Sequence, residues 1–572
     1  MATPSQVLPG GEASAAPGER SRGRGASPAG AKPGRGERPS GALSRARPLL
    51  AFLACLGGGA LVGLSTPPWG VLPLVWVGLA VLEYLLREDT PLASRPRPLV
   101  AGALRGLVFG AGTNLVALRF VVPVVTRFTP LPGWVGILAL VLLSLEQGLR
   151  FSVAAVLTIQ LARRGVPRWL AFGVGVYLGS LVPCVFPWTV ATPVATFPPL
   201  VQLAEFIGER GVAALIALSS GLAAEGLCAL FGPAASRSRA GALLAAAAAI
   251  PALTYAEGLV AMQSVERERL AAPKARVALL QPSIEATERW DPGEAGRILE
   301  RLTELTRSAE SGYPPPDLTV WTEGAYPYLV DARARSDVLG RRAIRQPGIR
   351  GPLFVGLMMR GPQGAYNAAT IVSDGRLSEP YFKSHLLIFG EYVPFGETFP
   401  WLNEVFYRGT GLVRGRRQVL LEAGRIRAVA LNCYEDTLSH AVREAMTVDP
   451  NLLVNITNDA WYTETMESEL HLELATTRSV EVRRDMVRAV NYGETTWVDA
   501  AGTVRARYSS GVPGVLITEP ALLSGRTLYA RAGDIPMVVI SILAVLPFLR
   551  RWRKAGAPRS KGEGRERSKN GA

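Results

Sequence analysis

Three polar residues lie where predicted strands end, and together they could do chemistry. Glu323 follows the apolar run in "LTVWTEG", Lys383 lies in "YFKSHLLIFGEYVPF", and Cys433 ends "RAVALNC". Acyl transfer through a thiol needs a thiolate, a base that takes and returns its proton, and a positive group facing the developing oxyanion. Glutamate, cysteine and lysine at neighbouring strand ends can supply all three functions without any histidine.

Each of these residues also has an ordinary interpretation. A lone cysteine after an apolar strand is usually a buried filler, and a glutamate or lysine in a loop is usually solvated. The residues after Cys433, "YEDTLSHAVREA", predict a helix whose N-terminus would favour the thiolate, whereas apolar burial alone would disfavour it. A Cys–His hydrolase using His385 or His440 is a further alternative, although His440 is expected to point away from the cysteine.

The surrounding elements divide the chain into a membrane part and a water-exposed part. Its 572 residues have a mean hydropathy of +0.20 and are 48% hydrophobic, yet 19% are charged. Windows long enough to cross a hydrocarbon core predict eight transmembrane helices, at 48–64, 70–86, 99–119, 132–161, 169–187, 211–231, 240–260 and 535–549. The fourth contains Glu146 and Arg150, which either pair or face the bundle interior, or lie near one end of a tilted helix.

The net charge of +15 is concentrated at the two ends of the chain. Residues 1–47 carry a net charge of +5 and residues 550–572 carry +7, so the remainder is nearly balanced. A basic groove for nucleic acid is therefore not expected. Both ends are rich in Gly, Ser, Pro and Arg, and we expect disordered basic tails over 1–47 and 551–572.

The basic residues of the connecting segments predict the orientation in the membrane. With eight spans, every Arg- or Lys-rich segment falls on the same side, which is then the cytoplasm. We therefore expect both tails in the cytoplasm, a seven-helix transmembrane region over 48–263, a catalytic domain outside the membrane over 264–530, and the eighth helix over 531–550. The fourth cysteine, Cys433, is then the one thiol that lies in a polar region.

The 264–530 region has an α/β pattern. Short β-rich runs alternate with helical patterns at 294–309 and 468–487. The four cysteines show no CxxC spacing, and the chain has three histidines, so we expect no zinc or di-metal site.

Five motifs occur here in a consistent order: "WTEGAYP", "YFKSHLLIFGEYVPFGE", "NCYED", "NITNDAWY" and "RSVEVRRDMVRAVNYG". Together with the predicted spans and "FPW…PPLVQLAEFIGERG" at 186–211, they resemble bacterial apolipoprotein N-acyltransferases over about 48–550. The resemblance implies a polytopic membrane protein with eight transmembrane helices and an αββα nitrilase-like (carbon–nitrogen hydrolase) sandwich outside the membrane. We expect no cofactor.

The resemblance also implies which residues act. A Glu–Lys–Cys triad carries the reaction in that family, and Glu323, Lys383 and Cys433 match it. Glu391 matches a second acidic residue that supports the triad, and Tyr434 and Glu435 match the Tyr–Glu pair after the nucleophile. We expect the substrate to contact five aromatic residues, for the first of which ordinary packing is an equal alternative: Trp290, Tyr392, Trp401, Phe406 and Trp461.

The loop over 395–413 concentrates aromatic and aliphatic residues in an otherwise polar region, including Phe399, Trp401 and Phe406. If the domain sits on the bilayer, this loop can dip into the interface and admit acyl chains, with its glycines as hinges. Plain core packing beneath the site is the alternative.

The family resemblance implies transfer of an acyl chain from a phospholipid, such as phosphatidylethanolamine, to the N-terminal amino group of a diacylated apolipoprotein through a cysteine thioester. It implies a bacterial inner-membrane protein whose catalytic domain is periplasmic. The expected partners are the phospholipid donor, the apolipoprotein acceptor and the lipid bilayer, without nucleic acid, and we expect a monomer. A membrane-tethered nitrilase-type amidase and a non-catalytic lipoprotein- or lipid-binding scaffold are the alternatives.

Overall fold

The computed structural model describes residues 41–89, 92, 97–232, 235–405, 411–463, 465–509 and 511–556. Most of the two predicted tails and Phe406 lie outside these residues. Within the described part of the chain, residues from 47 onward form one compact unit.

Helices form at all eight positions where the sequence predicts spans. They are α1 (Gly41–Gly63), α2 (Leu74–Leu86), α3 (Pro98–Ala117), α5 (Gly133–Arg163), α6 (Arg168–Ser180), α7 (Ala204–Phe231), α8 (Arg237–Ala271) and α15 (Ile535–Gly556), with a short α4 (Val121–Phe128) after α3. Among the described residues, α3, α5, α7, α8 and α15 are long and apolar enough to cross a membrane, whereas α1 and α2 are apolar but shorter.

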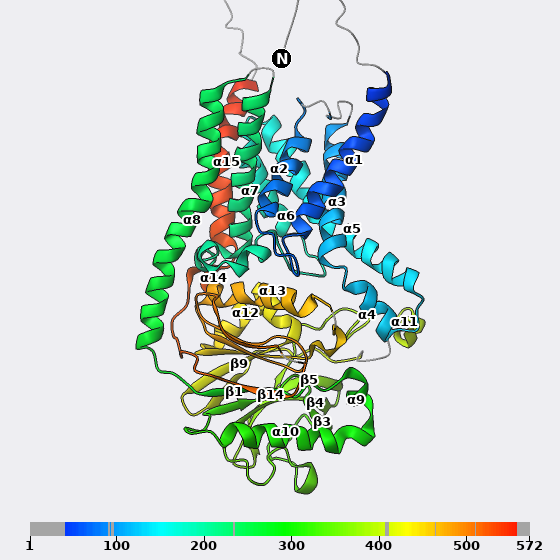
Figure 1. Ribbon diagram of the computed structural model, residues 1–572, viewed down its shortest axis with the longest axis vertical. Coiled ribbons are helices and arrows are strands. Elements are labelled where there is room, and N and C mark those ends of the chain that lie inside the picture. Colours follow the sequence, from blue (N-terminus) through cyan, green and yellow to red (C-terminus); the bar gives the residue numbers. More distant parts are fainter. Residues whose placement is uncertain are drawn as a thin grey trace, which may run out of the picture. The chain divides into compact units, whose positions relative to one another are not determined.

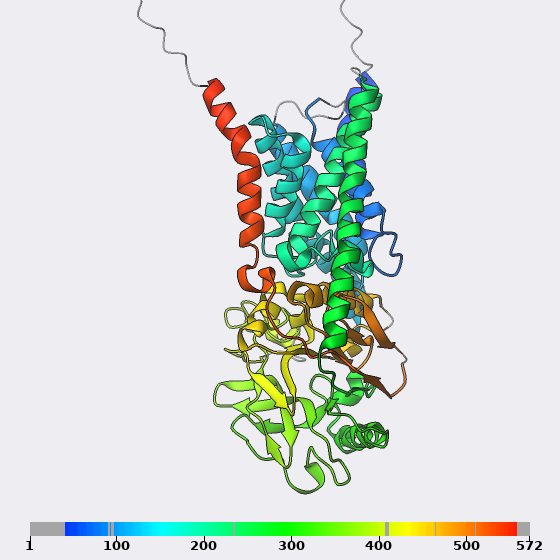
Figure 2. The same cartoon turned by 90° about the vertical axis from the view of Figure 1, so that its left-hand side faces the viewer.

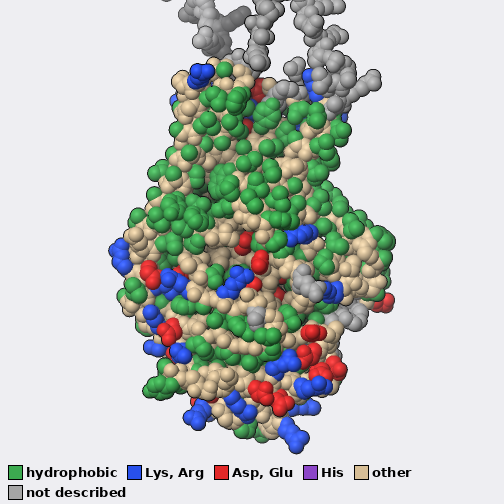
Figure 3. Space-filling view, in the orientation of Figure 1, with side chains coloured by type: hydrophobic (Ala, Val, Ile, Leu, Met, Phe, Trp, Pro, Cys, Tyr) green, Lys and Arg blue, Asp and Glu red, His purple; other side chains and the backbone are tan. Residues whose placement is uncertain are grey.

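The surface of these helices is suited to lipid. Figure 3 shows apolar side chains covering the helical part, while charged side chains gather over the sheets. Large apolar side chains on three of the helices are more than half exposed, namely Leu142 of α5, Val260 of α8 and Leu543 of α15. Such an apolar surface would be a liability in water and is stable against hydrocarbon.

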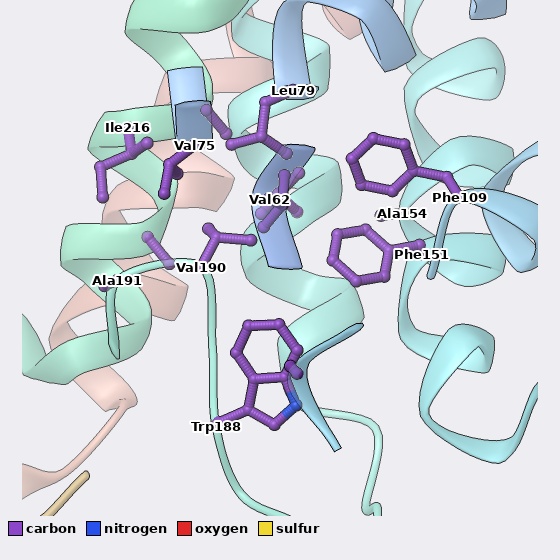
Figure 4. Close-up of a cluster of buried hydrophobic side chains, with 14 of the residues drawn as sticks. Val62, Val75, Leu79, Phe109, Phe151, Ala154, Trp188, Val190, Ala191 and Ile216 are labelled. Carbon is purple, nitrogen blue, oxygen red and sulfur yellow. The ribbon is translucent and has the colours of Figure 1, made fainter. Parts of the chain in front are cut away.

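Glycines let the helices approach closely. A Cβ on Gly59 of α1 would lie 1.9 Å from the Phe109 carbonyl oxygen of α3, and one on Gly106 of α3 would lie 2.2 Å from the Phe151 carbonyl oxygen of α5. Small residues at such crossings allow van der Waals contact between backbones inside a membrane. Figure 4 shows Phe109 and Phe151 side by side in the buried cluster that results, together with Val62 and Leu79.

The strands form two sheets. The first has the order β14-β1-β2-β4-β5-β6, with β3 beside β4 and β7 beside β5. Its strands are β1 (Val277–Gln281), β2 (Leu318–Val320), β3 (Tyr326–Asp331), β4 (Leu353–Gly361), β5 (Gly364–Ser373), β6 (Arg376–Leu377), β7 (Tyr381–Phe382) and β14 (Gly514–Thr518). The second has the order β13-β12-β11-β10-β9-β8, from β8 (Leu420–Ala423), β9 (Ile426–Asn432), β10 (Leu452–Thr457), β11 (Met486–Val490), β12 (Thr495–Val498) and β13 (Val504–Tyr508).

Alternating side chains join the sheets and their helices into an αββα sandwich. Ala428 and Ala430 of β9 face the core between the sheets, whereas Val429 and Leu431 pack with α12 (Ser439–Ala445) and α13 (Glu467–Val482). Leu280 of β1 packs instead with α10 (Ala295–Glu310) on the other outer face. Figure 1 shows α10 on one side of the sheets and α12 and α13 on the other. Strands covered on both faces are mostly apolar, as β1 (VALLQ) and β9 (IRAVALN) are.

Glu323 and Cys433 each follow a strand that has parallel neighbours, one in each sheet. β9 pairs with β10, and β10 with β11, in parallel register, as β1 does with β2 and β2 with β4. Side chains that follow parallel strands meet at the carboxyl edge of a sheet, where α/β proteins commonly bind ligands. Cys433 directly follows β9, and Glu323 follows β2 by three residues.

Two predicted helices differ from the observed ones. The helix predicted over 468–487 ends at Val482, because Arg483 adopts a left-handed conformation (φ 50°) and β11 begins at Met486. The residues after Cys433 first form a 3₁₀ turn, η5 (Cys433–Thr437), and only then the short α12.

Helix α8 extends beyond the helical part to the domain formed by the two sheets. α8 continues to Ala271, past the predicted boundary at 263, and Figures 1 and 2 both show it reaching the level of the sheets. Its Arg269 forms a two-bond contact with Asp485, Nε to Oδ1 and Nη2 to Oδ2, each 3.0 Å. Asp485 also accepts hydrogen bonds from the Trp497 indole (2.9 Å) and from two backbone N–H groups.

We predict that Asp485→Ala destabilises the protein by about 3–5 kcal/mol, because it leaves the Arg269 guanidinium buried without its main partner. The matched control is Arg276→Ala, which breaks the exposed contact with Glu519 (3.4 Å) and should change stability by less than about 1 kcal/mol. Urea unfolding of the purified protein in detergent, followed by tryptophan fluorescence, measures both. Equal effects of the two substitutions would contradict this account of the α8 contact.

Candidate active site

The Lys383 ammonium group lies between two carboxylates. Its Nζ atom is 3.1 Å from Glu323 Oε1 and 2.9 Å from Glu391 Oε2. Lys383 directly follows β7 and is buried, with 1% of its surface exposed. A buried ammonium of this kind is stable only when it is paired and hydrogen-bonded, as it is here.

Asn367 on β5 connects the two carboxylates from the other side. Its Nδ2 donates to Glu323 Oε1 (2.7 Å) and to Glu391 Oε1 (3.0 Å), and its Oδ1 accepts from Asn432 Nδ2 (3.3 Å). The Asn367 backbone carbonyl also accepts the Lys383 N–H (2.8 Å). Asn367 of β5 and the side chains of Glu323, Lys383 and Glu391, which lie after β2 and β7, therefore form one hydrogen-bonded group.

Cys433 lies at a sharp turn between β9 and η5. Its φ of 51° is in the left-handed region, which costs a non-glycine residue energy unless the surroundings hold it there. Asn455 of β10 supplies part of that support, because its Nδ2 donates to the carbonyls of Leu431 (3.0 Å) and Cys433 (3.2 Å). The side chain of Cys433 is half-buried.

The charge distribution around Cys433 favours the neutral thiol at rest. Burial raises the pKa of Cys433 well above its ordinary value, and the nearby Glu323 carboxylate raises it further, while Lys383 lowers it. The expectation that a helix N-terminus would favour the thiolate was thus wrong, because only a five-residue 3₁₀ turn begins at the cysteine. A short turn has too few aligned peptide dipoles to offset burial beside carboxylates.

The pKa values of Glu323 and Lys383 are both raised. The shift favours the neutral form of the glutamate and the charged form of the lysine. Burial raises the pKa of Glu323, although Lys383 opposes this, so its carboxylate is a better proton acceptor than an exposed one. Burial alone would lower the pKa of Lys383, but Glu323 and Glu391 more than offset this and hold the pKa well above its ordinary value. Lys383 is therefore a permanent cation, and Glu323 is the group that can exchange a proton.

Glu435 holds the backbone on both sides of the site. Its Oε1 accepts from the Tyr381 hydroxyl (2.7 Å) and from the N–H groups of Ser384 (2.8 Å) and His385 (3.0 Å), next to Lys383. Its Oε2 accepts the Asn432 N–H (2.9 Å), next to Cys433. Burial would raise the pKa of Glu435, but the His385 side chain, the Lys383 charge, the Asn432 N–H and the Tyr381 hydroxyl hold it below its ordinary value. Glu435 thus ties the lysine and cysteine segments together without touching the reacting atoms.

The residues expected to contact substrate lie in different places around this centre. Tyr392 packs under the Arg414 guanidinium (4.8 Å from the ring centroid), and Trp461 packs edge-on against Phe128 of α4 (4.9 Å between centroids). Trp401, in α11 (Pro400–Val405), is 59% exposed. The Trp290 side chain and Phe406 lie outside what the structure describes, so their roles stay predictions.

The described part of the aromatic loop is not packed into the core. Phe395, Phe399 and Trp401 are 74%, 49% and 59% exposed. The core-packing alternative for these three residues was therefore wrong. Figure 1 shows α11 close to α4, at the end of the helical part that faces the sheets.

Two residues near the triad were not predicted from the sequence. Asn367 is a buried amide in the apolar run "YNAATIV", and a polar residue in a strand covered on both faces is a signal that could have identified it. Arg289, in α9 (Ala286–Trp290), lies against Gly324, because a Cβ on that glycine would be 2.8 Å from Arg289 Nη2. Burial lowers the pKa of Arg289 to about 10, and the Glu323 charge opposes the shift. No local pattern in the sequence indicated its position.

The three histidines do not take part in the triad. The rings of His385 and His440 pack edge to face at 4.7 Å, and burial, aided by His385, lowers the pKa of His440 to about 4. His471 Nε2 lies 2.8 Å from Asp436 Oδ1.

Asp459, Glu467 and His471 lie close enough for their ligand atoms, all within 4.8 Å, to share an ion. Burial lowers the pKa of His471, but Asp436 more than offsets this and raises it to about 10. A protonated imidazole has no free lone pair for a metal. The expectation of no metal site stays a prediction.

We predict that the pH midpoint for the reaction of Cys433 with iodoacetamide lies above that of an exposed cysteine, because burial and the nearby carboxylates disfavour the thiolate. Glu323→Gln should move the midpoint to lower pH, since it removes a negative charge beside the thiol, and Lys383→Met should move it to higher pH, since it removes a positive one. Peptide mass spectrometry of alkylated Cys433 across a pH series measures this. A midpoint that rises in the Glu323 variant would contradict the electrostatic account.

Comparison with known proteins agrees with this architecture. Residues 58–222 match the family model of the apolipoprotein N-acyltransferase N-terminal domain, and residues 351–524 match that of carbon–nitrogen hydrolases. Lys383 and Cys433 lie inside the second match, whereas Glu323 precedes it.

Full-length relatives are also similar to the chain. An apolipoprotein N-acyltransferase of Geobacter metallireducens is 30% identical over 512 residues, which cover 85% of this chain and 92% of that protein. One of Bradyrhizobium diazoefficiens is 27% identical over 523 residues, covering 87% and 94%. The solved structure of an amidase from Nesterenkonia sp. is 19% identical, covering 46% of this chain and 96% of the amidase, with a TM-score of 0.33. With its apolar helices and its nitrilase-like carbon–nitrogen hydrolase domain, the chain belongs to the apolipoprotein N-acyltransferase family of enzymes.

Proposed function

We propose that this enzyme transfers an acyl chain from a phospholipid to the N-terminal amino group of diacylated apolipoproteins, through a thioester on Cys433. The observation that carries the proposal is the Lys383 ammonium held between Glu323 and Glu391 beside a half-buried thiol. The helical part of the same chain, which matches the N-terminal domain of the family, supports lipid substrates.

The first half of the reaction acylates the enzyme. Glu323 takes the proton of the Cys433 thiol as the sulfur attacks the ester carbonyl of the phospholipid, and a C–S bond forms. Lys383 stabilises the oxyanion of the tetrahedral intermediate. The C–O ester bond then breaks, and Glu323 returns the proton to the leaving oxygen, which releases a lysophospholipid.

The second half transfers the chain to the acceptor. The lipoprotein amine attacks the thioester carbonyl, Glu323 accepts the amine proton, and the C–S bond breaks to leave an amide. The same proton then restores the Cys433 thiol. Because donor and acceptor react in turn with one enzyme group, the kinetics should be ping-pong.

The pKa shifts are consistent with this division of roles. The raised pKa of Cys433 means that the proton leaves during attack rather than before it, so a base must lie close by. The raised pKa of Glu323 brings the carboxyl group nearer to the pH at which it can both accept and return that proton. Glu391 and Glu435 support the site by holding Lys383 and its backbone in place.

The membrane arrangement follows from the substrates. We propose that all eight apolar helices span the membrane, that both termini are cytoplasmic, and that the catalytic domain is periplasmic on a bacterial inner membrane. The basic residues of the connecting segments support this orientation. The exposed Phe395, Phe399 and Trp401 support a loop that contacts the lipid interface and admits acyl chains, with Tyr392, Trp461, Trp290 and Phe406 lining their path. We propose that the protein acts as a monomer.

We predict that incubation with phosphatidylethanolamine, without an acceptor, adds the mass of one acyl chain to the protein. The adduct should be absent from Cys433→Ala and should be removed by neutral hydroxylamine, which cleaves thioesters. Intact-protein mass spectrometry measures it.

A diacylated lipopeptide added afterwards should remove the adduct, and the chain should be recovered as an amide. An adduct lost only to water would favour a nitrilase-type hydrolase over a transferase. A folded protein without any adduct would exclude the thioester mechanism and leave a binding scaffold to be tested.

Substitution of two histidines can distinguish the triad mechanism from a Cys–His mechanism. His385→Gln and His440→Gln should each retain the rate of adduct formation to within about threefold, because neither ring contacts Glu323 or Lys383 in the described site. Lys383→Met should reduce that rate by about 10²–10³-fold, as expected for loss of an oxyanion-stabilising group. Loss of the adduct in either histidine variant, with folding retained, would favour the Cys–His alternative.

A further inference from the structure

A stretch of irregular backbone joins the helical bundle to the catalytic centre. Residues 181–190 follow α6 and contain no regular element before η1 (Thr192–Thr196). Pro183 and Pro187 have no N–H groups, and backbone polar groups at the edge of a membrane must be satisfied by other protein groups. The partners of this stretch therefore show what holds it in place.

Three side chains of α5 form hydrogen bonds with the backbone groups of this stretch. Arg150 donates from Nε to the Val182 carbonyl (3.1 Å) and from Nη1 to the Trp188 carbonyl (2.7 Å). Gln147 Nε2 donates to the Phe186 carbonyl (3.2 Å), and Glu146 Oε1 accepts the Val185 N–H (3.2 Å). The sequence left several possibilities open for Glu146 and Arg150. In the structure both side chains face the bundle interior, and each bonds to this stretch.

The catalytic domain bonds to the same stretch from the other side. The Tyr434 hydroxyl donates to the Val185 carbonyl at 2.7 Å. Burial raises the pKa of Tyr434 to about 12, with the Arg150 charge opposing the shift, so the hydroxyl keeps its proton and remains a donor. The backbone of one residue, Val185, is therefore held on both sides: its N–H donates to Glu146, and its carbonyl accepts from Tyr434, the neighbour of Cys433.

Two aromatic residues of the stretch, Phe186 and Trp188, make further contacts that hold it in place. Phe186 packs edge to face with Phe120 (5.9 Å), which packs in the same way with Tyr462 of the catalytic domain (5.8 Å). The Trp188 indole donates to Asn114 Oδ1 (3.0 Å) of α3. Figure 4 shows the Trp188 ring at the end of the buried cluster, beyond Phe151 and Val190. Such bracing leaves the stretch little freedom to move independently of α5.

We infer that Glu146, Gln147 and Arg150 are positioning residues for catalysis, which act through the 182–188 stretch and Tyr434 on the conformation of Cys433. Cys433 has a left-handed φ, so the turn that aims its sulfur depends on the residues that fix its neighbours. An ionisable side chain within a membrane helix is costly to retain unless it serves such a purpose. The inference rests on the proposed function for its kinetic readout.

The test is a double-mutant cycle on Arg150 and Tyr434. Arg150→Gln and Tyr434→Phe should each slow formation of the Cys433 acyl adduct by about 10–100-fold, since small displacements of reacting groups have effects of this size. The double variant should be no slower than the slower single variant, because both substitutions break the same connection. KM for the phospholipid should be unchanged, because Arg150 contacts backbone rather than substrate.

Arg105→Gln is the matched control. Arg105 of α3 also donates to two backbone carbonyls, those of Leu85 and Leu92, but neither belongs to the 182–188 stretch. It should retain the wild-type rate to within about twofold. Rates that multiply in the double variant, or an equal loss in Arg105→Gln, would overturn the inference in favour of general stabilisation of the bundle.

A second pair of variants keeps the inference testable if Arg150→Gln does not fold. Glu146→Gln retains an acceptor for the Val185 N–H and should keep the wild-type rate, whereas Glu146→Leu should slow adduct formation. Alkylation of Cys433 by iodoacetamide at fixed pH supplies a readout that needs no lipid. Absence of an adduct in the wild type would refute the proposed function alone, whereas unchanged alkylation rates and adduct rates in the Arg150 and Glu146→Leu variants would refute the inference.

Discussion

A single buried ammonium group balances the charge of the catalytic centre. Lys383 stands between Glu323 and Glu391, so the group of three carries one net negative charge before the thiol is counted. A thiolate at Cys433 would add a second negative charge in a site with little water, which is why its pKa is raised. The amide donors of Asn367 and the Leu387 N–H, 2.9 Å from Glu391 Oε2, spread the charge of the carboxylates without adding another cation. A thiol that is neutral at rest, beside a carboxyl group whose pKa is raised, follows from this balance.

The charge balance requires parts from both sheets and therefore constrains the fold. Lys383 and Asn367 come from neighbouring strands of the first sheet, and Cys433 comes from the second, with Glu435 bonded to the backbone of both segments. Displacement of one sheet against the other would separate Cys433, which follows β9 of the second sheet, from Glu323 and Lys383, which follow strands of the first. The bundle is joined to this assembly by further buried charges. Arg478 of α13 pairs with Glu209 of α7, whose backbone N–H in turn donates to Glu481 (2.9 Å).

The sequence was informative where function depends on strand ends and ordered motifs. Glu323 and Cys433 could be named because each follows an apolar strand with a parallel neighbour, whereas Lys383, which follows a short strand paired antiparallel with β5, was named from the ordered motifs. Asn367 could have been named as well, since its amide interrupts a strand buried on both faces. Arg289 could not, because its contact with Gly324 depends on the path of a loop and leaves no periodic signal.

The ends of helices and the backbone conformation of single residues were harder to predict from the sequence than the positions of the triad residues. The 3₁₀ turn after Cys433 and the end of α13 at Val482 depend on single left-handed residues, Cys433 and Arg483, which carry no glycine signal. The extension of α8 to Ala271 depends on the contact between Arg269 and Asp485, which are far apart in the sequence. Neither a left-handed non-glycine residue nor a contact between distant residues leaves a local signal in the sequence.

Polar residues inside the bundle bond to segments around the candidate site, which an anchor alone would not require. An anchor needs only an apolar surface toward lipid and close packing within. The helices here also bury Arg150, Gln147 and Glu209, and the bonds of these residues go to the 182–188 stretch, to α13 and to residues around them. Polar groups at this depth are stable only while those partners stay in place. The bundle and the catalytic domain therefore stabilise each other, which is consistent with a reaction whose substrates both reside in the bilayer.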